Sequence, residues 1–423
     1  MPQAAVIFPV ILGTLVLLYR YSKPQRWPPG PPPLLLVGNV HQMPKTHEWK
    51  TFAQWAKTYG DCVYVNVLGQ PIVILDSFAA ASDLLNQRSA IYASRPHLPM
   101  ANLYTGSVIL RVTYGYQTAS EGDKFVALAE EVLAAFSIAS QPGVWLVDII
   151  PWLRHLPSWF PGTEFKRTAA LANKDSPEMI QPNFVTTILS QSADVLPEED
   201  RQDLMWAAGS LFGGKTCFIN VLAGSDTTVS AISSFFLAMT MYPEVQSRAQ
   251  AEVDKVGTDG RLPQLSDRPN LPYVECVMQE VKRWNPVGPL GIPHMSTKDD
   301  VYRDYHLPAG TIIMANVWSM LHDPLVFPDP HEFRPERFLN DKRAVEVNTC
   351  VFGFGRRSCP GVYFAEASLF IAICTALSQC NISNPTNSRG QKIGKDVEYQ
   401  TGTISHPEKL FCNITPRAGT SGE

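Results

Sequence analysis

The chain has 423 residues, of which 45% are hydrophobic, so it can bury a large core and is too apolar to be disordered throughout. Its 35 basic and 39 acidic side chains leave a net charge of −4, which gives no electrostatic case for a nucleic-acid-binding protein. Eight cysteines without a CxxC pair argue against a zinc ribbon or a disulfide framework and are typical of a reducing compartment.

An apolar stretch opens the chain, with no charged side chain in the first nineteen residues. As a helix it measures about 28 Å, close to the roughly 30 Å hydrocarbon core of a membrane. Arg20, Lys23 and Arg26 follow at once and indicate a cytosolic flank. We therefore predict a transmembrane anchor over residues 1–20. The alternative is a cleaved signal peptide, but the stretch lacks a basic start and a small-x-small cleavage site.

A proline-rich run, WPPGPPP, covers Trp27–Pro33 and cannot continue a helix. Such runs prefer an extended, stiff conformation, so we predict a hinge over residues 21–38 between the anchor and the body. A ligand for a proline-binding domain is the alternative for this run. No repeat divides the remainder, so residues 39–417 are expected to form one large domain, followed by a tail at 418–423.

Beyond the hinge the chain combines helical periodicity with one clear hairpin. The pattern predicts an amphipathic helix over Trp49–Gly60 and a hairpin over Val63–Leu75 that turns at Gly69 and Gln70. The other expectations are helices at Ser77–Arg88, within residues 122–256 and after Pro360, and an irregular Leu307–Pro335. The expected fold is mainly α with a minor β portion.

Two stretches of the body carry polar groups inside apolar helices. The sequence AGSDTT interrupts the predicted helix Val221–Met239, where Gly224 leaves room beside the helix for a flat ligand. Asp226 and Thr227 can organise water and pass protons into an apolar pocket. The alternative is a Ser/Thr-rich kink in a buried helix.

The second stretch is the helix predicted over Tyr273–Pro286, which places Glu280 and Arg283 one turn apart on the same face. Because their surroundings are apolar, a buried pair needs a third partner to satisfy its remaining hydrogen-bonding groups. The sequence FRPERF offers Arg337, which can share the Glu280 carboxylate.

The stretch FGFGRRSCPG, Phe352–Gly361, places one cysteine directly before the long apolar helix. The free N–H groups at the start of a helix favour a thiolate there. Arg357 supplies a permanent cation for an acidic group. The neighbouring glycines allow close approach of a bulky partner: Gly353, Gly355 and Gly361. Together these features indicate Cys359 as a haem iron ligand beside a propionate anchor; the alternative is a structural cysteine at a helix start.

The order of a proline-rich hinge, AGSDT, the ExxR pair, PERF and the cysteine loop resembles the cytochrome P-450 superfamily of haem-thiolate monooxygenases, most closely its fungal microsomal type. The resemblance implies the cytochrome P-450 fold and haem b as the cofactor, with Cys359 as its axial thiolate ligand. It implies that Arg357 and His294 hold the propionates. The remaining positions expected at the cofactor are Phe352, Gly353 and Gly361.

The resemblance also implies roles away from the iron. Asp226 and Thr227 would supply protons during oxygen activation, and Glu280, Arg283 and Arg337 would stabilise the haem-side core. One oxygen atom of O2 would enter a hydrophobic small molecule, a secondary metabolite or xenobiotic, with electrons from NADPH through a cytochrome reductase. The expected location is the endoplasmic reticulum membrane, with a single pass and the body facing the cytosol. The glycosylation sequons at Asn381 and Asn413 would then stay unmodified.

The centre of the chain departs from this pattern. No Trp-Arg-x-x-Arg helix, which grips a propionate in the family, occurs between His97 and Val144. Residues 159–184 are too few for the paired helices that cover the substrate pocket, and Lys215–Ala223 resembles an insertion. We therefore expect a fold that lacks part of the central helices and weaker haem retention. The alternative function is a haem-binding relic or splice form with little or no turnover.

Overall fold

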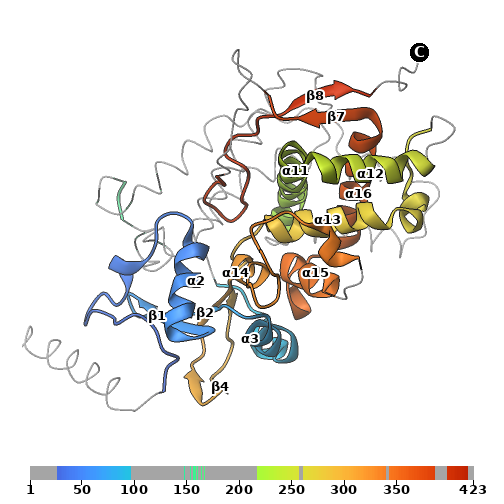
Figure 1. Cartoon of the computed structure of the whole chain (residues 1–423). Coiled ribbons are helices and arrows are strands. Elements are labelled where there is room, and N and C mark those ends of the chain that lie inside the picture. The colour runs from blue at the N-terminus through green and yellow to red at the C-terminus, as the bar shows by residue number, and fades with distance from the viewer. Residues whose placement is uncertain are drawn as a thin grey trace, which may run out of the picture.

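The computed structural model describes residues 26–96, 217–256, 261–339, 343–385 and 398–417, with isolated positions between 147 and 166 (Figure 1). In the helix that begins at Cys217, side chains are described from Asp226 onward. The predicted membrane anchor, the tail and most of the central region lie outside the described residues.

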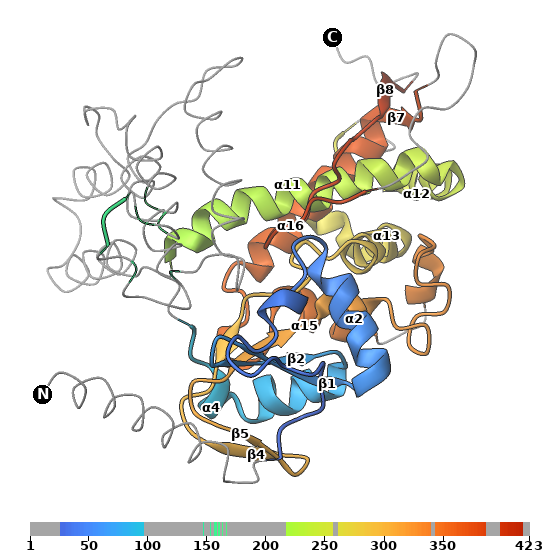
Figure 2. The same cartoon turned by 90° about the vertical axis from the view of Figure 1, so that its left-hand side faces the viewer.

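Four helices form the helical part of the described structure: α11 (Cys217–Met241), α12 (Pro243–Val256), α13 (Pro272–Trp284) and α16 (Val362–Gln379). They pack against one another, and α11 crosses α16 (Figures 1 and 2). The predicted helix at Tyr273–Pro286 is confirmed as α13, which begins with proline in its first turn. Its face Val274, Val277 and Val281 is fully buried in a core with Phe235 and Phe370, as 3.6-residue periodicity requires.

The sheet lies beside this helical part (Figure 1). Its strand order is β1-β2-β6-β3. The strands are β1 (Cys62–Val67), β2 (Gln70–Leu75), β6 (Ile312–Ala315) and β3 (His294–Met295). The predicted hairpin is confirmed, with β1 and β2 antiparallel and Cys62 opposite Leu75. Its turn lies one residue earlier than expected, at Leu68 and Gly69, which both adopt positive φ (52° and 89°) and so match the twist of a two-residue hairpin.

Short helices cover the sheet and connect it to the helical part. The helix expected from Trp49 is confirmed as α2 (Glu48–Tyr59), and it ends where the Gly60 N–H donates to the Ala56 carbonyl. The helical pattern at Ser77–Arg88 forms α3 (Phe78–Ala81) and a π-helical turn, η2 (Ser82–Gln87), and α4 follows at Ser89–Tyr92. The remaining connecting helices are α14 (Val317–Leu321) and α15 (Ala344–Phe352).

The prediction of an irregular Leu307–Pro335 was wrong in part, because this segment contains β6 and α14. Ile313, Met314 and Ala315 are all buried in β6, so the strand lacks the alternation that identifies a half-exposed strand. The other described elements are η1 (Val40–Gln42), η4 (Leu265–Asn270), η5 (Pro335–Phe338), η6 (Gly355–Arg357), β4 (Asp300–Tyr302), β5 (Tyr305–Leu307), β7 (Cys380–Ser383) and β8 (Asn413–Pro416).

Helix α16 is the apolar helix predicted after Pro360. Among the described residues it is the one helix whose length and composition would allow it to cross a membrane. Leu369, Phe370, Ile373 and Leu377 are nevertheless buried in the core formed with α11, α12 and α13. Packing inside the protein therefore explains these apolar residues of its second half, whereas Tyr363 and Phe364 near its start are exposed.

Asp76 ties the end of β2 to α14. The Asn316 side-chain amide and the Ser319 hydroxyl each donate to its carboxylate at 2.8 Å. Burial, outweighing these two hydrogen bonds, raises the pKa of Asp76 from 3.8 to about 7. The folded state therefore keeps a proton that the unfolded state releases, and this group makes stability fall as pH rises from about 4 to about 7.

We expect the Asp76→Asn variant to lose this contribution, so its stability relative to the wild type should increase as pH rises through that window. Urea unfolding at several pH values measures the effect, and Asp304→Asn, an exposed turn residue, is the matched control. A constant difference between Asp76→Asn and the wild type from pH 4 to 7 would contradict the assignment.

Candidate active site

The loop between α15 and α16 holds Cys359 at the start of a helix. Helix α15 ends at Phe352, and Gly353 follows with φ 88°. The Cys359 N–H donates to the Phe352 carbonyl at 2.6 Å, and α16 begins three residues later with Gly361 as its N-cap. Of the seven cysteines whose side chains the structure describes, Cys359 is the one that is exposed. The loop therefore presents a thiol outward at the positive end of a helix.

Gly355 and Gly361 of this loop are required as glycines for different structural reasons. Gly355 has φ 57°, and a Cβ there would lie 2.2 Å from the Leu85 carbonyl oxygen. Its role in the structure is close approach to η2. A Cβ at Gly361 would lie 3.8 Å from the Cys359 Sγ, so a larger side chain there would crowd the sulfur. From the sequence we predicted that both glycines allow a bulky ligand to approach. For Gly355 the structure gives a different reason, because it packs against η2.

Three basic side chains converge beside this loop. The Arg357 Nε donates to the Ala93 carbonyl at 2.8 Å. Arg95 Nη1 donates to the Ile292 and Pro293 carbonyls at 2.5 and 2.9 Å. His294 Nδ1 lies 2.8 Å from the Tyr92 carbonyl oxygen. Because a carbonyl can only accept, Nδ1 carries the hydrogen and Nε2 is left for a second partner.

These three residues, Arg95, His294 and Arg357, form what we call the basic cluster. Burial and the charge of Arg357 lower the pKa of Arg95 to about 10. Burial and the charge of Arg95 lower the pKa of His294 to about 4, so this imidazole is neutral near pH 7. Among the described residues, no ion pair joins the cluster to a carboxylate. Within the described residues, the positive charge of Arg95 and Arg357 therefore has no carboxylate partner, which suits an anionic ligand.

The residues of this site fit a haem group. A haem carries an iron atom that binds thiolate and two propionates that bind cations. The exposed Cys359 thiol and the adjacent basic cluster supply both kinds of group. The sequence analysis did not predict a role for Arg95, because a single arginine before a proline forms no recognisable local pattern. Only its tertiary contact with the loop before β3 reveals it.

A second polar network fixes the start of α16. Lys282 of α13 is buried and donates to Glu366 on the first turns of α16 and, at 2.6 Å, to Asn348 of α15. Arg268 also donates to Glu366 at 2.7 Å. The Lys282 Nζ lies 5.7 Å from the centre of the Phe352 ring. The two helices that flank the Cys359 loop are therefore tied to α13, which gives the loop a rigid base.

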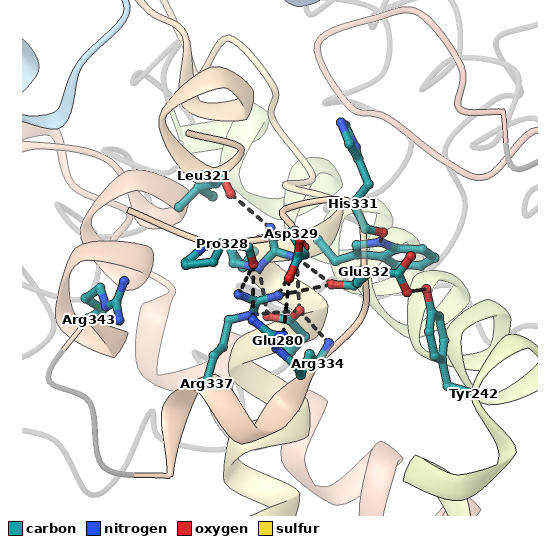
Figure 3. A network of polar contacts seen from close by, with 12 residues as sticks. Tyr242, Glu280, Leu321, Pro328, Asp329, His331, Glu332, Arg334, Arg337 and Arg343 are labelled. Atoms are coloured by element: carbon teal, nitrogen blue, oxygen red, sulfur yellow. Dashed lines mark hydrogen bonds and ion pairs between the residues drawn. The ribbon is translucent and has the colours of Figure 1, made fainter. Parts of the chain in front are cut away.

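The ExxR pair forms a buried network (Figure 3). Arg283 Nε and Nη2 donate to the two Glu280 carboxylate oxygens at 2.7 and 2.9 Å. Arg337 Nε lies 3.2 Å from the same carboxylate, which is the contact expected from the sequence. Glu280 and Arg283 are fully buried, and Arg283 also donates to the Leu321 carbonyl. Within the described part of the chain, no hydrogen bond or ion pair of this network involves the Cys359 loop.

Asp226 and Thr227 lie on α11, both partly buried. The Asp226 Oδ1 lies 3.0 Å from the His406 Nε2. The sequence did not predict His406, which lies in the C-terminal segment far along the chain. The structure therefore places the predicted residues in three groups: the Cys359 loop with the basic cluster, the Glu280 network, and Asp226 with His406.

Comparisons with known proteins agree on one family. The family model described as Cytochrome P450 matches residues 28–106 and 214–410. "Cytochrome P450 monooxygenase 105" of Postia placenta is 37% identical over 498 aligned positions, covering 98% of this chain and 93% of that protein. "Cytochrome P450 monooxygenase claR" of Ampulloclitocybe clavipes is 36% identical, and the alignment covers 100% of this chain and 93% of that protein. The aligned lengths exceed the 423 residues of this chain, so these relatives carry segments that it lacks.

Proposed function

The chain belongs to the cytochrome P450 family, and from that premise we propose a membrane-anchored monooxygenase that inserts one oxygen atom into a hydrophobic small molecule of secondary metabolism or a xenobiotic. Electrons come from NADPH through a cytochrome reductase. The observation that carries the proposal is the exposed Cys359 thiol beside three basic side chains without a carboxylate partner in the described structure.

The chain's residues divide the work. Cys359 would bind the haem iron through its sulfur, with Gly361 leaving space beside that sulfur. Arg357, Arg95 and His294 would hold the propionates. When bound, haem supplies the activation of O2. Asp226 and Thr227 on α11 hold and pass the protons that this reaction consumes. Glu280, Arg283 and Arg337 stabilise the core on which the cysteine loop rests.

The apolar residues at the start of the sequence support a location at a membrane. The apolar residues 1–20 anchor the protein in the endoplasmic reticulum membrane, and the prolines up to Pro33 space the body from it. The reductase approaches from the cysteine side, where Tyr363 and Phe364 of α16 are 87% and 75% exposed. Large exposed aromatic side chains are typical of a surface that binds a partner.

A second candidate is a haem-binding form with little turnover. It is favoured by the family match, which leaves out residues 107–213, and by the extra segments of the relatives. Reconstitution with a reductase separates the two candidates. A panel of hydrophobic compounds is screened for a spin-state shift and then for NADPH-dependent product. Product formation supports the monooxygenase, whereas full haem occupancy without product from any compound supports the second candidate.

Replacing Arg95 with glutamine is expected to weaken haem retention. A hydrogen bond to a charged group contributes about 1.5–3 kcal/mol, so haem loss to an acceptor protein should be roughly 10- to 100-fold faster. Transfer of haem to apomyoglobin, followed by absorbance, measures this rate. Arg356→Gln is the matched control, because Arg356 is an exposed arginine of the Cys359 loop and does not belong to the basic cluster. Equal rates for Arg95→Gln and the wild type would remove Arg95 from the propionate site.

A further inference from the structure

Asp226 on α11 faces His406, which lies near the C-terminal end of the sequence. The His406 Nε2 lies 3.0 Å from the Asp226 Oδ1, and the two side chains are 21% and 19% exposed. The pair is thus shielded by the protein but reachable by water. Both side chains can hold a proton, and a distance of 3.0 Å is that of a direct hydrogen bond.

The segment that carries His406 is held in place by buried hydrogen bonds of its neighbour, Ser405. The Ser405 N–H donates to the Val287 carbonyl at 2.8 Å. The Ser405 carbonyl accepts from the Ser230 hydroxyl at 2.6 Å and from the Asn285 side-chain amide at 3.4 Å. The His406 carbonyl accepts from the Gln400 N–H at 2.8 Å.

One of these anchors, Ser230, lies on the same helix as the Asp226 carboxylate. Ser230 is four residues after Asp226 on α11, so the two residues share one helix face and both reach the C-terminal segment. The contact between His406 and Asp226 is therefore one part of a built junction between α11 and residues 398–408, in which Ser230 and Ser405 are fully buried.

We infer that His406 is a positioning residue that orients the Asp226 carboxylate and returns protons to it from solvent during the proposed oxygenation. Each reaction consumes substrate, O2, two electrons and two protons, and yields the hydroxylated product and water. The protonated imidazole passes the proton on Nε2 to the Asp226 Oδ1 and keeps the hydrogen on Nδ1. After Asp226 has passed its own proton on, Nε2 regains a proton from a hydronium ion of the solvent. The inference rests on the proposed function, because Asp226 is assigned there to proton delivery.

The first test needs no turnover. In haem-loaded protein labelled with ¹⁵N-histidine, the His406 signals are assigned by their loss in His406→Gln. Replacing Asp226 with asparagine removes the acidic acceptor, so the His406 ¹⁵N shifts should change. The comparable pair His306 and Asp299, 3.5 Å apart on the β4–β5 hairpin, is the matched control, and its signals should stay in place. Unchanged His406 shifts in Asp226→Asn would overturn the inference.

The second test separates proton supply from other steps. Hydrogen peroxide brings oxygen, electrons and protons in one molecule, so it does not depend on a proton route through the protein. We expect His406→Gln to lower reductase-driven product formation by about 10- to 100-fold. Peroxide-driven product formation should stay at the wild-type rate, and His306→Gln should retain both activities.

The outcomes are distinguishable. A wild type that forms no product by either route overturns the proposed function itself. A wild type that forms product together with a His406→Gln variant that is equally active by both routes overturns only the role of His406. A variant that loses both activities to the same extent also contradicts the inference, because it indicates damage to the site as a whole.

Discussion

Replacing Arg283 with methionine is expected to lower the free energy of unfolding by about 3–5 kcal/mol, since the change leaves a fully buried carboxylate without its main partner. Arg283 donates to both Glu280 oxygens and to the Leu321 carbonyl, and methionine can replace none of these bonds. The contact from Arg337 at 3.2 Å and the hydrogen bond from the Arg334 N–H at 2.8 Å remain, but both go to the same carboxylate oxygen and leave the other without a donor among the described residues. Urea unfolding of the purified variant measures the loss.

The neighbouring arginine provides the control for this prediction. Arg334 pairs with Asp329 at 3.4 Å, and their side chains are 45% and 67% exposed. Arg334→Met should therefore cost less than about 1 kcal/mol. The double variant Glu280→Gln with Arg283→Met should lose less than the sum of the single variants, because Glu280 no longer carries a charge that needs Arg283. An Arg283→Met variant as stable as Arg334→Met would contradict the assigned role of the network.

Replacing Cys359 with serine is expected to abolish product formation. A serine hydroxyl does not ionise as a thiol does, so it cannot supply the electron-rich ligand that promotes cleavage of the O–O bond. Haem content and NADPH-dependent product, both measured on the variant reconstituted with a reductase, report the effect. Cys380→Ser is the matched control, because Cys380 is a partly buried cysteine at the start of β7, beyond the far end of α16. Product formation by Cys359→Ser at the wild-type rate would contradict the role of the thiol.

Local patterns predicted the parts of the fold that depend on nearby residues. The periodicity of α2 and α13 and the β-formers around Gly69 were sufficient, because each element buries one face at a fixed spacing. Helix α16 was predicted from its long apolar run after Pro360. The contact between Glu280 and Arg283 was also predictable, since residues three apart share a helix face. Strand β6 was not, because it is short and buried along most of its length.

The residues of the candidate site also divide into those that local sequence predicts and those that it does not. Cys359 could be predicted from its own loop, where the glycines, the arginine and the following helix are all local in sequence. Arg95 and His406 could not, because each acquires its role from a partner far along the chain. Such partners depend on tertiary packing, which the spacing of residue types within one segment does not encode.

The most direct test of Cys359 as the iron ligand is the absorption spectrum of the reduced, haem-loaded protein under carbon monoxide. The Cys359 assignment predicts a strongly red-shifted Soret band, as thiolate ligation produces, and loss of this band in Cys359→Ser. A wild-type band at the position typical of histidine-ligated haem, or a red-shifted band that persists in Cys359→Ser, would contradict it.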